Sequence, residues 1–308
     1  MFSFLFRKNA VKVLGKVATT DKDYEFTGTS NNDSLTVLGS FSASGSGVNR
    51  VSTGDGNDAV TIIGKVESQS RNEFDLGNGN NTFTSGGMIA KQGGVNTLSS
   101  GSGKDVVTIL GNMEALANSS NILATGDGND VLTVTGKIRS EEGGRNQIDL
   151  GNGANVATVT GGLYAKDNGM TRMAAGDGND VVTITGKMES ASLNEIDLGG
   201  GKNTLTLTGG MTALEGGTNR IVTGDGNDVV TMVGKMESRH MNEINLGGGK
   251  NVLTLATGMA SKGEGANKVV MGDGDDVLTV AGKMESEFLN QIDLGGGNNV
   301  ATFARGMS

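Results

Sequence analysis

The segments GDGNDVVTITGKMES (residues 176–190) and GDGNDVVTMVGKMES (residues 224–238) lie 48 residues apart and differ at two positions. Each is followed by an Asn-Glu-Ile segment and by a second glycine-rich turn, GGGKN. The 48-residue unit therefore contains two similar halves, each with one glycine-rich turn. Repetition at this period is typical of a solenoid, in which each repeat packs only on its neighbours.

The Asp or Asn that closes each glycine-rich turn marks the repeat along the chain. Successive markers are 23 to 25 residues apart. The twelve markers are Asp33, Asp58, Asn81, Asp105, Asp130, Asn155, Asp180, Asn203, Asp228, Asn251, Asp276 and Asn299. Counting back 24 residues adds Asn9 and a first coil that begins with Phe2 and Phe4. We therefore expect one domain, residues 1–308, of about thirteen coils with about 24 residues each.

Three short strands are predicted in each coil. The second residue after a marker is apolar or Ala, the third is Thr in all twelve coils, and the fourth is usually apolar, an alternation that indicates a strand with Thr facing outward. A strand before the turn follows the pattern of Asn194, Ile196 and Leu198. A third strand carries an apolar residue at position +8, assigned in the coil of Asn81 to Ile89. The fold class is thus all-β, a three-sided parallel β-solenoid.

Glycine and methionine have structural roles in this scheme. Gly at position +6, as at Gly186, Gly209 and Gly234, is expected at the corner between the second and third strands, where a side chain would crowd the bend. The Met residues at position +8 are interpreted as unbranched core fillers rather than as a copper or haem site. The Asn row is interpreted as amides that bond from coil to coil.

The composition of the chain excludes several functions. The protein has 308 residues with 53 Gly, no Pro, no Cys and a single His, so zinc-thiolate sites, disulfides, a Cys/His relay and a pair of His ligands are excluded, and a Ser/His relay would depend on His240 alone. A net charge of −9 argues against nucleic-acid binding. No segment approaches the ~20 apolar residues of a membrane span, so membrane insertion is not expected. Near-identical coils also offer no unique catalytic site, and we expect no enzyme activity.

The glycine-rich turns carry the candidate metal site. The motif GDGND recurs in four turns and becomes GDGDD at residues 272–276. It resembles the turn of the RTX family of secreted calcium-binding β-rolls, although that family repeats its turn twice in each 18-residue coil. The resemblance implies that Ca²⁺ lies between stacked turns, held by backbone carbonyls and by carboxylates. The candidate ligands are Asp55, Asp58, Asp127, Asp130, Asp177, Asp180, Asp225, Asp228, Asp273 and Asp276. The alternative is that these side chains bond turn amides.

Two outward rows suggest further roles. Arg172, Glu195, Arg220, Glu243, Lys268 and Gln291 fall in one row of predicted neighbours, where alternating charge would fix the register of the coils. The Thr-x-Thr pairs, such as Thr183 and Thr185, resemble the hydroxyl lattice of β-solenoid antifreeze proteins. Residues such as Val233 interrupt that lattice, and strand propensity explains Thr without ice binding.

The two ends of the chain decide the functional expectation. The sequence begins at a first strand and ends just after Met307, and neither end has a recognisable cap. Phe2, Phe4, Phe303 and Met307 are therefore expected at self-assembly ends, where copies join head to tail as a homopolymer. The expected function is a structural filament, extracellular or on the cell surface, without a recognisable cleaved signal peptide. The alternatives are a calcium-binding RTX-like adhesin or surface-layer module, and an intracellular filament similar to bactofilin, so a cytoplasmic location is not excluded.

Overall fold

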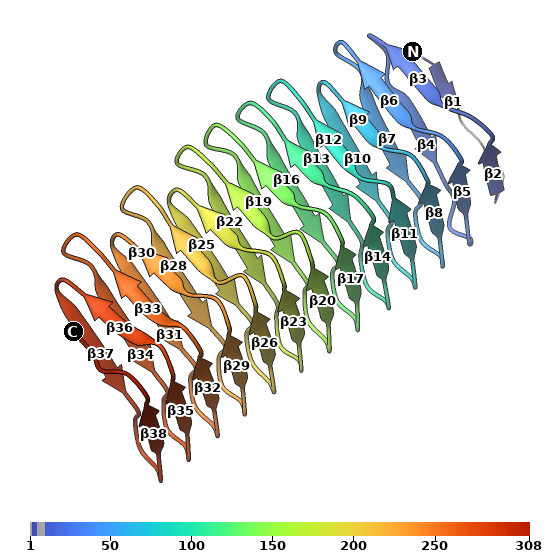
Figure 1. Ribbon diagram of the computed structural model, residues 1–308. Helices are drawn as coiled ribbons and strands as arrows, with labels where there is room; N and C mark the ends of the chain where they lie inside the picture. The colour runs from blue at the N-terminus through green and yellow to red at the C-terminus, as the bar shows by residue number, and fades with distance from the viewer. Residues whose placement is uncertain (1, 5–9) are drawn as a thin grey trace.

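The repeating strands of the chain form three parallel sheets that share one core. The computed structural model describes residues 2–4 and 10–308, and the side chains of residues 10–308. Figure 1 shows the coils stacked along one axis, with the two termini at opposite ends of the stack. The described part of the chain contains no helix that could span a membrane.

Sheet A contains the strand that precedes each glycine-rich turn. Its thirteen strands are paired in parallel and in chain order. They are β1 (Phe2–Phe4), β4 (Tyr24–Thr27), β7 (Val48–Ser52), β10 (Arg71–Asp75), β13 (Val95–Ser99), β16 (Ser120–Ala124), β19 (Arg145–Asp149), β22 (Met170–Ala174), β25 (Leu193–Asp197), β28 (Thr218–Val222), β31 (Met241–Asn245), β34 (Ala266–Val270) and β37 (Leu289–Asp293).

Sheet B contains the strand that follows each turn and carries the Thr row. It also has thirteen strands. They are β2 (Ala10–Val13), β5 (Ser34–Val37), β8 (Ala59–Ile62), β11 (Thr82–Ser85), β14 (Val106–Ile109), β17 (Val131–Val134), β20 (Val156–Val159), β23 (Val181–Ile184), β26 (Thr204–Leu207), β29 (Val229–Met232), β32 (Val252–Leu255), β35 (Val277–Val280) and β38 (Val300–Phe303).

Sheet C contains the shortest strands and has twelve of them. They are β3 (Val17–Thr20), β6 (Phe41–Ser44), β9 (Val66–Ser68), β12 (Met88–Ala90), β15 (Met113–Ala115), β18 (Ile138–Ser140), β21 (Leu163–Ala165), β24 (Met188–Ser190), β27 (Met211–Ala213), β30 (Met236–Ser238), β33 (Gly258–Ser261) and β36 (Lys283–Ser286). In the last coil Met307 forms an isolated parallel bridge with Met284. The all-β, three-sided parallel solenoid is thus confirmed.

The core is a narrow column between the three sheets. In β23, Val182 and Ile184 are buried while Val181 and Thr183 face outward, which confirms the alternation predicted for this strand. The Met row at position +8 is buried from Met113 to Met284, as expected of core fillers.

One core assignment is wrong. In β12 it is Met88, not Ile89, that pairs with Val66 and Met113 and is buried. The corner before β12 is one residue shorter than the corner before β15, because it is made by Gly86 and Gly87 alone. Gly87 has a φ of 134°, a conformation that glycine adopts without strain.

The corner glycines are required by close approach between coils. A Cβ added to Gly209 would lie 2.4 Å from the backbone carbon of Gly186, the equivalent residue of the preceding coil. Backbone at this distance leaves no room for a side chain, which confirms the role predicted for the glycine at position +6.

Candidate functional site: stacked turns and the terminal coil

The marker residues form a continuous hydrogen-bonded ladder on the inside of the turns. From Asp58 to Asn299, the side-chain Oδ1 of each marker accepts a hydrogen bond from the backbone N–H of the marker in the preceding coil, at 2.6 to 3.0 Å. Asp130, for example, accepts from Asp105, and its own N–H donates to Asn155. Eleven of the markers, from Asp33 to Asp276, are buried. The ladder therefore ties every turn to the next.

Asn and Asp complete this ladder differently. At Asn155 and Asn203 the side-chain amide donates to glycine carbonyls of its own turn, which satisfies the whole side chain. At Asp130 and Asp228 the second oxygen, Oδ2, is buried and has no hydrogen-bond partner among the described residues. Asp58, Asp105, Asp180 and Asp276 share this arrangement.

The buried carboxylates are consequently hard to ionise. Burial raises the pKa of both Asp130 and Asp228 to about 6, because the lost hydration outweighs the backbone hydrogen bonds that favour the charged form. Burial likewise raises the pKa of Asp58, Asp105, Asp180 and Asp276. Ionisation of these aspartates at neutral pH therefore has a desolvation cost that the asparagine markers do not have.

The first aspartate of each predicted calcium turn lies on the outside. Asp55, Asp127, Asp177, Asp225 and Asp273 are exposed. Asp225 accepts a hydrogen bond from the backbone N–H of Gly248 at 2.9 Å, and Asp273 accepts one from Gly296 at 2.9 Å. The two candidate ligands of one turn thus occupy different surfaces, one inside and one outside. In residues 2–4 and 10–308, no three acidic or histidine side chains gather as a metal site would require.

A lysine in a turn between two aspartate turns forms an ion pair with an acidic side chain. Lys250 lies in the turn before Asp275, and its Nζ is 2.9 Å from Asp275 Oδ2. A backbone hydrogen bond from Asn298, together with this ion pair, keeps the pKa of Asp275 below its ordinary value. This ion pair therefore links two adjacent turns, those of Asn251 and Asp276.

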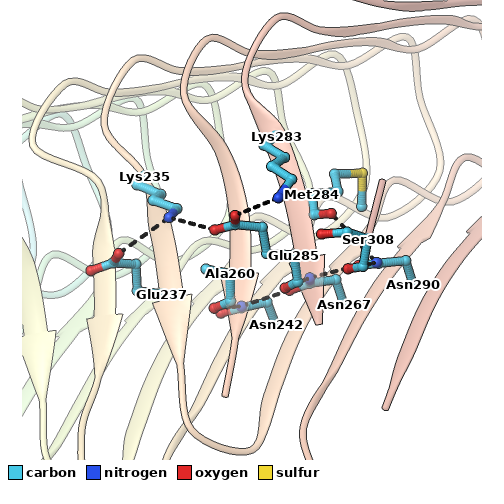
Figure 2. Close-up of polar contacts among 10 residues, drawn as sticks. All are labelled: Lys235, Glu237, Asn242, Ala260, Asn267, Lys283, Met284, Glu285, Asn290 and Ser308. Carbon is cyan, nitrogen blue, oxygen red and sulfur yellow. Dashed lines mark hydrogen bonds and ion pairs between the residues drawn. The ribbon is translucent and has the colours of Figure 1, made fainter. Parts of the chain in front are cut away.

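The terminal coil exposes residues that are core residues elsewhere. Phe303 is 39% exposed and Met307 is 51% exposed, whereas the equivalent Val280 and Met284 of the preceding coil are fully buried. Strands β37 and β38 are the last members of their sheets. Figure 2 shows the Asn row ending here, where the Asn290 amide donates to the carbonyl of Ser308 at 3.1 Å. The predicted end residues Phe303 and Met307 thus lie at an open face of the solenoid.

The N-terminal end residues are described only in part. Phe2 and Phe4 lie in β1, which pairs with β4 and is the first strand of sheet A. Their side chains, and the predicted marker Asn9, lie outside the described residues.

Charged rows hold the coils in register on sheets A and C. On sheet A, Glu195 lies between Arg172 and Arg220, with oxygen to nitrogen distances of 3.3 and 2.8 Å. Glu243 lies between Arg220 and Lys268 in the same way, at 3.4 and 3.1 Å. On sheet C, Lys235 contacts both Glu237 and Glu285 (Figure 2). The predicted alternating row is confirmed.

Two features of the site were missed from the sequence. The Asn row contains one break, at Thr171, which the Asn pattern of the neighbouring coils signals directly. The outer face of sheet B carries no charge from Ser34 to Ala304, a pattern that the rows at positions +1, +3 and +5 display in the sequence.

Comparison with known proteins gives no relative from which a function can be transferred: no family model, no curated protein and no solved structure matches the chain.

Proposed function

We propose that the protein is a structural filament subunit whose copies join head to tail. The observation that carries the proposal is the exposed core of the terminal coil, at Phe303 and Met307. Apolar core residues beside unpaired strand edges form a surface that another parallel strand layer would cover. At the opposite end, β1 and β2 are the first strands of their sheets.

The geometry of such a contact follows from the fold. All strands of a sheet run parallel, so the first coil of a second copy would continue the strand order after β37 and β38 in the same direction. The contact joins two different surfaces and does not close on itself, which produces an open polymer. Each subunit of about thirteen coils would advance the filament by roughly 62 Å, at ~4.8 Å per coil.

The test is electron microscopy and sedimentation of the purified chain, compared with two matched Phe→Asp variants. Phe303→Asp places a charge on the open face of the terminal coil. Phe288→Asp changes a residue that is 74% exposed on the loop before β37. We expect filaments from the wild type and from Phe288→Asp, and none from Phe303→Asp. A wild-type chain that sediments as a monomer at high concentration would refute the proposal.

A calcium-dependent module similar to the RTX family is the second candidate. It is favoured by the unpaired buried Oδ2 atoms of Asp58, Asp130, Asp180, Asp228 and Asp276, each in a GDGND or GDGDD turn. Carboxylate and carbonyl oxygens are the ligands that Ca²⁺ takes. Thermal unfolding with Ca²⁺ and with a chelator separates the two candidates, since a filament held by strand pairing survives the chelator and an RTX-like roll unfolds.

The proposed location of the filament is outside the cell or on its surface. The chain has no Cys, which is compatible with an oxidising environment. Protease treatment of intact cells, followed by detection of the protein, tests this location against an intracellular filament similar to bactofilin. Loss of the protein supports a surface filament, and its protection until lysis contradicts one.

A further inference from the structure

The outer face of sheet B differs from the other two faces because it carries no charge from β5 to β38; on the strand before them, β2, Lys12 is exposed. Its outward residues fall into three rows along the solenoid, at positions +1, +3 and +5 from the markers. From Ser34 to Ala304 these rows contain only Ser, Thr, Ala, Val, Leu, Ile and one Gly. Most of the exposed large hydrophobic side chains of the described residues belong to them. They are Leu38, Ile63, Leu110, Val156, Val181, Val229, Val233, Val252, Val277 and Val300.

This face is large enough for a stable protein interface. The strands from β5 to β38 extend over about 55 Å at ~4.8 Å per strand, and the three rows are about 13 to 15 Å wide. The face therefore offers about 700 to 800 Å² to a partner. A pair of such faces would bury about 1,500 Å², close to the usual size of specific interfaces. The central row is Thr in every coil from β5 to β38, and the exposed apolar side chains lie in the two rows beside it. Exposed apolar surface of this kind marks interaction sites on soluble proteins.

The partner that fits this face is a second copy of the same face. Val and Thr in regular rows on two sheets can interdigitate as in face-to-face sheet packing, at about 10 Å between sheets. The outer faces of sheets A and C carry rows of ion pairs, such as Arg220 with Glu243 and Lys283 with Glu285. From β5 to β38, the outer face of sheet B can approach its own copy without opposing like charges, whereas the outward rows of sheets A and C bring charged side chains into the contact.

The two long borders of the face carry opposite charge. The corner toward sheet C bears a row of lysines, namely Lys65, Lys137, Lys187, Lys235 and Lys283. The turns on the other border bear the exposed aspartates, namely Asp55, Asp127, Asp177, Asp225 and Asp273, together with Asp275 and fewer lysines, at Lys104, Lys202 and Lys250.

These borders select one orientation. If a two-fold axis lies along the solenoid, the two copies run parallel and the lysine border of each lies beside the acidic border of the other. If the copies run antiparallel, like borders meet. Lys187, Lys235 and Lys283 already contact glutamates of sheet C, but such exposed ion pairs are weak and can exchange partners.

We propose that the outer face of sheet B is a lateral interface to a second copy of this chain, packed face to face with the two solenoid axes parallel. The interface is distinct from the head-to-tail contact because it uses a side of the solenoid and not its end. Joined filaments would therefore be paired, and chains that cannot join end to end would be dimers.

The test uses matched Thr→Lys variants on two sheets. Thr158→Lys and Thr183→Lys place a charge at the middle of the outer face of sheet B. Thr97→Lys makes the same change on sheet A, beside Glu73 in the pairing register. Each is made in the Phe303→Asp background, which removes the end contact, and the mass is measured by light scattering over a range of concentrations.

We expect a dimer for Phe303→Asp alone and with Thr97→Lys, and an association constant at least tenfold lower with Thr158→Lys or Thr183→Lys. Circular dichroism of each variant checks that the solenoid is folded. A monomer for Phe303→Asp alone, or equal association of all the lysine variants, would overturn the lateral interface. If Phe303→Asp still forms filaments, Phe303 does not belong to the head-to-tail contact. The number of solenoids that lie side by side in each filament then tests the lateral interface.

Single cysteines test the orientation, since the chain has no Cys of its own. Position +3 is the central row of the face and lies near the proposed two-fold axis. In the parallel arrangement Thr61→Cys, near one end, and Thr158→Cys, near the middle, are both cross-linked between copies by a short bis-maleimide, because two sheets about 10 Å apart are too distant for a direct disulfide. Cross-linking at Thr158→Cys alone would overturn the parallel arrangement.

Discussion

The side-chain amide of Asn146 is 3.5 Å from the hydroxyl of Thr171, at the one break in the row of inward asparagines that runs from Asn49 to Asn290. On either side of the break, each Asn amide donates to the Oδ1 of the next Asn at 2.7 to 2.9 Å. The Oδ1 of Asn194, the residue after the break, is buried without a hydrogen-bond partner in the described part of the chain.

Replacing Thr171 with Asn is expected to stabilise the protein. The new amide would donate to Asn194 Oδ1 and its oxygen would accept from Asn146, which restores the row. Satisfying a buried acceptor contributes roughly 1 to 2 kcal/mol to the free energy of unfolding. Urea denaturation measures the change as a higher midpoint. Thr108→Asn, on the outward row of β14, is the control and leaves the midpoint within about 0.5 kcal/mol of wild type.

Asp130→Asn and Asp228→Asn are expected to stabilise the protein at pH 7. The folded pKa of about 6 lies above the ordinary value of 3.8, so the folded state binds protons that the unfolded state has lost. Stability therefore falls as pH rises from about 4 to about 6, and ionised Asp at neutral pH costs on the order of 1 kcal/mol after solvent screening. Asparagine already fits this position at Asn155 and Asn203.

The measurement is the denaturation midpoint of each variant at pH 4.5 and at pH 7. The substitution should raise the midpoint more at pH 7 than at pH 4.5. An equal effect at the two pH values would show that the buried carboxylates do not titrate in this range.

Much of this fold follows from the sequence because each coil repeats the same constraints. The marker residues, the outward Thr row and the buried Met row all recur at fixed offsets. A pattern that is unclear in one coil can therefore be recognised from the other coils. The core position at Met88 was misassigned because the offset was carried over from other coils, and only the backbone shows that Gly86 and Gly87 shorten the corner. The repeats also place the marker residues in one row, but they cannot give the direction of the hydrogen bonds. The rotation of the Asp130 side chain decides that its Oδ1 reaches the preceding coil. It also leaves Oδ2 without a hydrogen-bond partner among the described residues.

Gly209→Ala is expected to destabilise the protein strongly. The added Cβ would lie 2.4 to 2.6 Å from backbone atoms of Gly186 and Lys187, and these atoms cannot move without disturbing the sheet hydrogen bonds. A loss of about 3 kcal/mol is expected, at the upper end of the range of about 1 to 3 kcal/mol that is usual for overpacking. Thermal unfolding measures the loss. An unchanged melting temperature would mean that neighbouring coils are separated more widely at this corner.

Gly15→Ala separates folding from assembly, because Gly15 occupies the corresponding corner of the first complete coil. A Cβ on Gly15 has no atom of the described residues within 4 Å, whereas a Cβ on the next corner glycine, Gly39, would lie 2.6 Å from the Gly15 backbone. Within one chain, the corner at Gly15 lies against the corner at Gly39. In a head-to-tail filament, the last coil of the preceding copy would lie against Gly15 in the same way. The variant is therefore expected to fold with wild-type stability and to form filaments at least tenfold more slowly. Light scattering against time measures assembly, and thermal unfolding of the dispersed protein is the control. Wild-type assembly by Gly15→Ala would contradict a junction that continues the solenoid coil on coil, since the corner would then face open solvent in the polymer as well.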